Sequence, residues 1–217
     1  MAGLRAVLFD NDGTLVDTYE LLMACFRAAT ADVLGEALPD EVLAAKIGTP
    51  LVEQVKDFSD DPAVRQRIVA AYKRHGALVD DTIRGFPGMT ECLQALSGAG
   101  LALGVVTSKM HASAERNLAL AGAAPYLSCI VSPDDCPQHK PDPGPVLHAC
   151  GLLGVEAGAS AYVGDSPFDI RAGNAAGALT VAVTWGMFSE DVLRAEGPDR
   201  VCRSFEELTA LLCALAR

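Results

Sequence analysis

Four short stretches of the sequence carry acidic, hydroxyl or basic side chains at or beyond the end of an apolar run. Their polar residues are Asp10 and Asp12; Thr107, Ser108 and Lys109; Lys140; and Asp165 with Asp169. This combination suits phosphoryl transfer, which needs a positioned nucleophile and the neutralisation of phosphate charge. The stretches therefore define a candidate site for chemistry on a phosphate group.

Within this set, the two carboxylates at Asp10 and Asp12 could divide the work between a nucleophile and a general acid and base. Carboxylates this close repel unless a cation lies among them, and Asp10, Asp12 and Asp165 offer the hard oxygen ligands that Mg²⁺ prefers. Thr107 and Lys140 would bind the nonbridging phosphate oxygens. Taken singly, each stretch also fits a structural role, as a turn, a helix N-cap or a solvated charge.

The elements that must position these residues follow from the pattern of apolar runs. Short apolar runs, typical of strands buried on both faces, lie at residues 4–9, 101–106, 128–131, 161–163 and 179–183. Helical stretches separate them at residues 89–96, 111–121, 145–153 and 169–176. Strands that alternate with helices predict an α/β fold with a Rossmann-like parallel sheet, which binds ligands at the carboxyl ends of its strands.

The region from about residue 17 to residue 84 interrupts this alternation with apolar residues at helical spacing. One stripe contains Leu21, Leu22, Cys25, Phe26 and Ala29, and another contains Val64, Ile68, Ala71 and Tyr72. Proline and glycine clusters divide the region into three or four helices. The sequence predicts an α/β core of residues 1–16 and 86–217, with a small all-helical cap domain of residues 17–85 inserted after the first strand.

The same stretches resemble the signatures of the haloacid dehalogenase superfamily, and within it the phosphatases of the phosphoglycolate phosphatase type. Residues 9–15 (FDNDGTL) are similar to the first signature, residues 105–109 (VVTSK) to the second, Lys140-Pro141 to the third, and residues 164–169 (GDSPFD) to the fourth. All four occur in the family's order. The resemblance implies a phosphatase with a helical cap, and it covers essentially the whole chain.

The resemblance also implies roles for individual residues. Asp10 would be the nucleophile that forms an aspartyl phosphate, and Asp12 would protonate the leaving group and then activate water. Mg²⁺ would be held by the Asp10 carboxylate, the Asp12 backbone carbonyl and Asp165, with Asp169 in or just behind this set of ligands. Thr107 would hydrogen-bond the phosphoryl group, and Lys140 would neutralise it.

Other branches of the superfamily fit less well. Carbon–halogen cleavage is disfavoured because those members lack an acid at the position of Asp12. The sugar phosphomutase branch typically has a histidine in the first cap helix, whereas the earliest histidine here is His75. The phosphonoacetaldehyde-cleaving branch uses a lysine in that helix, and no lysine precedes Lys46.

A phosphomonoesterase remains, with phosphoglycolate the favoured substrate and pyrophosphate or a sugar phosphate as alternatives. Thr49, in the turn Gly48-Thr49-Pro50, and Arg84 are the candidate substrate contacts of the cap, together with Ser108 and Lys109 of the core. The turn that contains Thr49 could equally be a plain interhelical turn, and Arg84 could be a solvated charge. A phosphoacceptor signalling module is a remote alternative, because such modules carry their acceptor after the third strand and lack a helical insert.

Composition limits the partners. The chain has 17 Lys and Arg against 28 Asp and Glu among 217 residues, a formal charge of −11, which argues against nucleic-acid and membrane binding. Half of the residues are hydrophobic, enough for a sizeable core. The seven cysteines show no metal-ligand spacing and are typical of a reduced, cytoplasmic protein. We expect a small phosphorylated substrate, and a monomer or homodimer.

Overall fold

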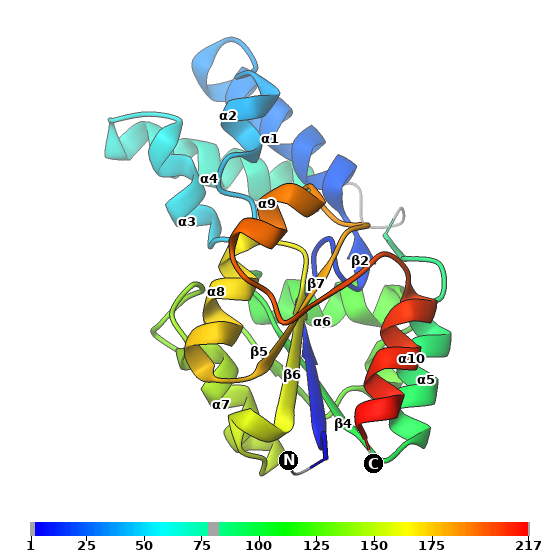
Figure 1. Ribbon diagram of the computed structural model, residues 1–217. Coiled ribbons are helices and arrows are strands. Elements are labelled where there is room, and N and C mark those ends of the chain that lie inside the picture. The colour runs from blue at the N-terminus through cyan, green and yellow to red at the C-terminus, as the bar shows by residue number, and fades with distance from the viewer. Residues whose placement is uncertain (1–2, 78–82, 217) are drawn as a thin grey trace.

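The computed structural model describes residues 3–77 and 83–216 and contains a six-stranded parallel sheet at its centre (Figure 1). In the order in which they lie side by side, its strands are β5 (Cys129–Val131), β4 (Ala102–Val106), β1 (Ala6–Phe9), β6 (Ser160–Gly164), β7 (Leu179–Val183) and β8 (Arg200–Cys202). The first strand is thus central, and its carboxyl end lies between those of β4 and β6. This order brings the residues that follow β1, β4 and β6 to one edge of the sheet.

Helices cover both faces of the sheet, as the apolar runs require. On β1, Val7 and Phe9 belong to one buried cluster and Leu8 to another, as expected for side chains that alternate between faces. The helices of the core are α5 (Met89–Gly98), α6 (His111–Leu120), α7 (Gly144–Leu153), α8 (Pro167–Ala176), α9 (Glu190–Ala195) and α10 (Phe205–Leu215). Figure 1 shows α5 and α10 together on one side of the sheet and α7 and α8 on the other. Short 3₁₀ helices lie at Ala124–Tyr126 and Ala157–Ala159.

This architecture confirms the predicted α/β fold with a parallel sheet. The five strands expected from apolar runs are present, with bounds that differ by at most two residues. The sixth strand, β8, was not predicted. It is only three residues long, Arg200 is exposed, and it lies at the edge of the sheet, so it lacks the continuous apolar run of a buried strand.

A layer of helices lies above the carboxyl edge of the sheet in Figure 1. It consists of α1 (Tyr19–Leu34), α2 (Asp40–Ala44), α3 (Leu51–Gln54), a 3₁₀ turn (Val55–Asp57) and α4 (Pro62–Gly76). These helices share a buried cluster of their own, in which the rings of Phe26 and Phe58 pack edge to face with centroids 5.5 Å apart. Burial here explains why the region shows helical periodicity.

Two short strands connect this helical layer to the sheet. β2 (Val16–Asp17) pairs antiparallel with β3 (Arg84–Gly85) at the point where the chain leaves the core and returns to it. The division into residues 1–16 and 86–217 for the core and 17–85 for the cap stays a prediction. Within these ranges, residues 1–2, 78–82 and 217 lie outside the described part of the chain.

Two expectations from composition also concern the fold. All seven cysteines lie in the described part of the chain, where they are free thiols, five of them buried. Across residues 3–77 and 83–216, every helix is too short or too polar to cross a membrane.

Candidate active site

The strand ends and the helical layer enclose a cavity of about 400 Å³. Its wall includes most of the residues that the sequence singled out, namely Asp10, Asp12, Thr49, Thr107, Ser108, Lys109 and Asp165. Lys140 and Asp169 are buried directly beside Asp10. Segments far apart in the sequence meet here because parallel strands present their carboxyl ends at one edge.

Lys140 joins two carboxylates in the floor of the site. Its Nζ lies 2.9 Å from Oδ1 of Asp10 and 2.7 Å from Oδ1 of Asp169, and all three side chains are buried. Burial alone would lower the pKa of Lys140, but the charges of Asp10 and Asp169 outweigh it and hold that pKa above its usual value. Lys140 is thus a permanent positive charge next to Asp10.

The carboxylate of Asp10 is buried among other carboxylates. Burial raises its pKa well above the usual value, and the charges of Asp169 and Asp165 add to this, while Lys140 lowers it. Although Lys140 is close, Oδ1 of Asp10 receives no hydrogen bond of good geometry from the described residues. This oxygen therefore keeps lone pairs for a further ligand.

Asp165 follows β6 and is held from two sides. The Thr14 hydroxyl donates to Oδ1 at 2.7 Å, and the Met187 backbone N–H donates to Oδ2 at 2.8 Å. Burial raises the pKa of Asp165 to about 7, with a further contribution from Asp169. Thr14 belongs to the first signature, but no local pattern indicates this contact, because its partner is 151 positions away.

Two glycines leave space for the Asp165 carboxylate. A side chain at Gly13, which has φ of +81°, or at Gly186 would collide with the Asp165 side chain. Gly13 is therefore required both by its left-handed backbone and by the close approach of a carboxylate. The position of the Asp165 carboxylate thus explains why the Asp-x-Asp-Gly-Thr signature contains glycine in this chain.

Asp169 is fixed by hydrogen bonds to both of its oxygens. Besides Lys140, Oδ1 accepts from the Tyr162 hydroxyl at 2.9 Å, and Oδ2 accepts from the backbone N–H of Ser166 at 3.1 Å. Ser166 and Asp169 also form the capping box at the start of α8, which explains why a carboxylate occupies the first turn of this helix. Tyr162 was not among the predicted site residues, and nothing in the local sequence marks it.

Asp12 has partners of its own and faces the cavity. The Thr18 hydroxyl donates to its Oδ1 at 2.7 Å, and the Lys109 ammonium lies 3.1 Å from the same oxygen. Its side chain is about one-sixth exposed (17%), whereas that of Asp10 is nearly inaccessible (5%). The first signature thus yields one buried carboxylate beside Lys140 and one that water and a substrate can reach.

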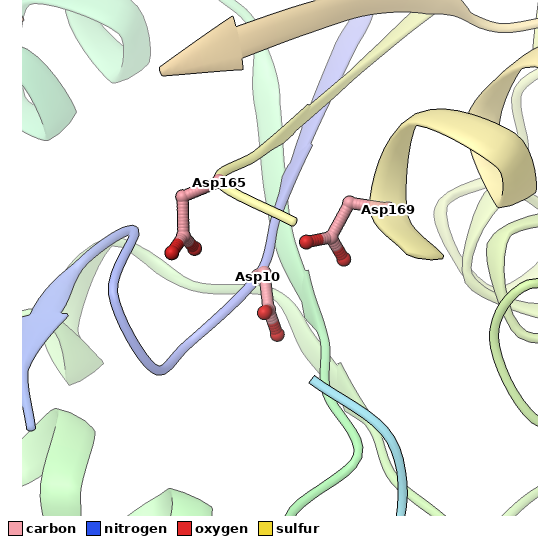
Figure 2. Close-up of side chains that lie close together, drawn as sticks. All are labelled: Asp10, Asp165 and Asp169. Carbon is pink, nitrogen blue, oxygen red and sulfur yellow. The ribbon is translucent and has the colours of Figure 1, made fainter. Parts of the chain in front are cut away.

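The buried carboxylates have the composition of a metal site. Oxygens of Asp10, Asp165 and Asp169 lie within 4.8 Å of one another, and Figure 2 shows Asp10 between the other two. Oxygen ligands suit a hard divalent cation, and a cation would offset the mutual repulsion that raises the pKa values of Asp10 and Asp165. Each oxygen of Asp169 accepts two hydrogen bonds, from Lys140 and Tyr162 and from the backbone and hydroxyl of Ser166, whereas each oxygen of Asp165 accepts one from the described residues. Asp10 and Asp165 therefore fit a metal better.

The helical layer contacts the core at a turn beside the site. The Ser108 hydroxyl donates to the backbone oxygen of Gly48 at 2.7 Å. The neighbouring Thr49 lines the cavity, and its hydroxyl donates to the oxygen of Lys46. Thr107 also lines the cavity, and its hydroxyl oxygen accepts from the backbone N–H of Lys109.

Arg84 is the predicted site residue that the structure keeps apart from the others. It is exposed in β3, its guanidinium donates to the oxygen of Ile83, and it is absent from the cavity wall.

Two further residues lie next to the first signature or within it. Trp185 supports the signature loop, because its indole N–H donates to the backbone oxygen of Thr14 at 3.0 Å. Asn11 is fully buried, and its side-chain amide has no hydrogen-bond partner among the described residues.

The role of Gly13 leads to a first testable prediction. Gly13→Ala is expected to lower activity by about 100-fold. The new side chain would displace the Asp165 carboxylate, and a displacement of about 1 Å at a reaction site can cost that much. Gly35→Ala is the matched control, because Gly35 has a similar φ of +89° but open space around it. Both variants should lose about 1–2 kcal/mol of stability from backbone strain, and Gly13→Ala should lose more because of the collision with Asp165. Equal activity of the two variants, measured beside their thermal unfolding, would contradict the proposed contact with Asp165.

A parallel α/β sheet with carboxylates, a hydroxyl and a buried lysine at its strand ends suits chemistry on a phosphate group. The family model described as haloacid dehalogenase-like hydrolase matches residues 7–183. The chain belongs to this family, which confirms the resemblance noted in the sequence and the prediction that the protein is an enzyme.

Relatives with assigned names agree with this classification. The chain is 37% identical over 213 residues to a phosphoglycolate phosphatase of Cupriavidus necator, covering 95% of this chain and 92% of that protein. It is 32% identical over 215 residues to the pyrophosphatase PpaX of Halalkalibacterium halodurans, covering 99% of each. A hydrolase from Pseudomonas syringae has a similar structure, with a TM-score of 0.88, 25% identity and coverage of 98% of this chain and 100% of that one.

Proposed function

We propose that the protein is a Mg²⁺-dependent phosphomonoesterase that works through an aspartyl phosphate on Asp10. The observation that carries this proposal is the arrangement of two carboxylates from one signature. Both residues line the cavity, but Asp10 is nearly inaccessible beside the permanent charge of Lys140, whereas the side chain of Asp12 is more exposed. A nucleophile that needs charge neutralisation and an acid that must meet the leaving group require such different surroundings.

In the first half of the reaction, a carboxylate oxygen of Asp10 attacks phosphorus and the bond from phosphorus to the leaving oxygen breaks. Asp12, protonated at this stage, donates its proton to that oxygen, so the leaving group departs as an alcohol. Lys140 offsets the negative charge near Asp10, and Thr107, a residue of the cavity wall, would hold a phosphoryl oxygen through its hydroxyl.

In the second half, the Asp12 carboxylate takes a proton from water, and the water oxygen attacks phosphorus. The bond between phosphorus and Asp10 breaks, which returns the Asp10 carboxylate and releases phosphate. Thr18 and Lys109 hold Asp12 in position for both proton transfers. Lys109 also lines the cavity, where it is a further contact for the phosphate.

Asp10 and Asp165 would hold the magnesium ion, together with the backbone carbonyl of Asp12. When bound, Mg²⁺ neutralises charge on the phosphoryl oxygens and orients them toward the nucleophile. Asp169 would act from behind this set, since its hydrogen bonds with Lys140 and Tyr162 position the ammonium group. Asp169 is thus a positioning residue rather than a ligand of the metal.

Phosphoglycolate is the substrate that the sequence favours, with pyrophosphate or a sugar phosphate as alternatives, and the relatives named above support testing the first two. Thr49, which lines the cavity, is a cap residue that would meet the leaving group. Arg84 as a substrate contact would require β3 to approach the cavity. Action in the cytoplasm, as a monomer or a homodimer, stays a prediction from sequence.

Removal of the metal tests the proposal directly. Phosphate release from p-nitrophenyl phosphate should stop when EDTA is added and should return when excess MgCl₂ is supplied. The physical reason is that Asp10 and Asp165 repel each other and the phosphate unless a cation lies among them. Unchanged activity of a metal-stripped preparation would overturn the role given to Mg²⁺.

A further inference from the structure

The wall of the cavity opposite the carboxylates is mainly apolar. It is contributed largely by the helical layer, where Leu22 and Phe26 of α1, Ile47 and Leu51 around the Gly48 turn, and Val69 and Tyr72 of α4 face the same space. From the core side, Met187 and Phe188 continue this wall. The phosphate would occupy the end near Asp10, so the apolar end is the place for the leaving group.

The cavity is also larger than a small leaving group needs. Its volume of about 400 Å³ falls within the range of roughly 300–1,000 Å³ that is typical of sites for drug-sized ligands. Glycolate or a second phosphate would fill only a minor part of it, and the rest would hold water against apolar side chains. Such a wall favours a leaving group that covers it.

The two lysines and Gln54 of the wall do not favour an anionic leaving group. The ammonium of Lys109 is paired with Asp12, and Lys73, also in the wall, is exposed, so an anion bound to it would stay hydrated. Gln54 donates through Nε2 to the oxygen of Thr49, while its buried Oε1 finds no donor in the described part of the chain. A carboxylate of the leaving group beside this oxygen would place two acceptors next to each other, which is unfavourable.

We propose that the leaving group is an uncharged, largely apolar alcohol, considerably larger than glycolate. This inference rests on the proposed phosphatase function and changes its favoured substrate. The phosphate of such an ester binds near Asp10 and Lys140, and its organic part displaces water from the surface of Leu22, Val69 and Tyr72. Phosphoglycolate and pyrophosphate then become poor substrates of this enzyme, whatever its relatives act on.

A series of n-alkyl phosphates tests the inference, because methyl, butyl and hexyl phosphate differ in apolar surface but hardly in the reactivity of the phosphate ester. The expected result is a kcat/KM that rises by up to about fourfold for each methylene added, the factor that corresponds to about 0.8 kcal/mol per buried CH₂. Hexyl phosphate should exceed phosphoglycolate and pyrophosphate by about tenfold or more.

The outcomes separate this inference from the function on which it rests. If kcat/KM does not change with chain length, or if phosphoglycolate or pyrophosphate is the better substrate, the inference is wrong while the phosphatase function stands. If none of these esters, nor p-nitrophenyl phosphate, is hydrolysed in the presence of Mg²⁺, the proposed function itself fails.

A variant that fills the cavity gives an independent test. Val69→Phe places a larger side chain at a half-buried position of the wall, and it should lower kcat/KM for hexyl phosphate by about tenfold or more while methyl phosphate changes little. Val192→Phe is the matched control, since Val192 is 41% exposed on α9 and lies outside the wall. Methyl phosphate turnover reports that each variant is folded. An equal loss on both esters, or no loss on either, would overturn the inference.

Discussion

Asp10→Asn is expected to abolish turnover, with kcat reduced by about 10⁴-fold or more, as is usual when a covalent nucleophile is removed. An amide cannot form the acyl phosphate, and no other carboxylate in the described cavity lies beside Lys140 in the position of Asp10. Steady-state phosphate release from p-nitrophenyl phosphate measures this effect. Asp17→Asn, a change of the same kind at an exposed neighbouring position, should leave kcat unchanged.

The stability of the Asp10→Asn variant separates chemistry from folding. Burial and the neighbouring carboxylates disfavour a charge at Asp10, which is why its pKa is raised. A neutral amide removes this repulsion, and Lys140 keeps its contact with Asp169. The melting temperature should therefore be maintained or increased while activity is lost. Full activity would show that Asp10 is not the nucleophile, and a large loss of stability would contradict the electrostatic description of the site.

Lys140→Met is expected to affect both stability and activity. The variant leaves Asp10 and Asp169 buried without their shared cation, and breaking a buried pair in this way costs about 3–5 kcal/mol. Activity should fall by about 100-fold or more, because the charge near the nucleophile is no longer offset. Lys56→Met provides the control, since Lys56 pairs with Glu53 at the surface and such pairs contribute about 1 kcal/mol or less.

The loss of stability in Lys140→Met should depend on pH in a defined direction. A carboxyl group whose pKa is raised in the folded state binds its proton more tightly there than in the unfolded chain, so protonation stabilises the fold. The pKa of Asp10 is already raised and increases further without Lys140. The variant should thus recover stability relative to the parent as the pH falls through the range between the pKa of Asp10 in the variant and the lower, though already raised, pKa of Asp10 in the parent. If the difference in melting temperature between Lys140→Met and the parent is constant across this range, Asp10 is not the source of the lost stability.

The sequence could predict the carboxyl edge of the sheet because the relevant information is local. An apolar run that stops at Asp10, or one that stops before Asp165, places both carboxylates at the ends of parallel strands. The helical periodicity of residues 17–84 likewise reflects burial of Phe26 and Ile68 in a shared cluster. These patterns depend on neighbours in the chain, and a single sequence carries them.

Contacts that depend on the tertiary structure could not be predicted in this way. Tyr162 reaches Asp169, and the Met187 amide reaches Asp165, only because the strand and the loop after β7 pack at the same edge. Arg84 was proposed as a substrate contact from its position near the end of the insert, but pairing of β2 with β3 places it outside the cavity wall. The apolar character of that wall also emerges only when α1, α4 and the loop after β7 are assembled.

The contact between Ser108 and Gly48 illustrates the same limit. The sequence offered Ser108 as a phosphate ligand, yet in the structure its hydroxyl donates to a backbone oxygen of the helical layer. Gly48 has φ of +102°, and a side chain there would press on Ser166 and Phe168. This turn therefore packs directly against the loop that carries Asp165, which links the position of the helical layer to the carboxylates below it.

The most direct test of the account is the identification of the phosphorylated residue. The Asp12→Asn variant, which should accumulate the intermediate, is mixed with p-nitrophenyl phosphate and Mg²⁺, quenched with acid and treated with borohydride, which reduces an acyl phosphate to an alcohol. Peptide mass spectrometry is predicted to find homoserine at position 10, only when substrate was present. Homoserine at another aspartate, or an unmodified Asp10 in a sample that had released p-nitrophenol, would contradict the central claim.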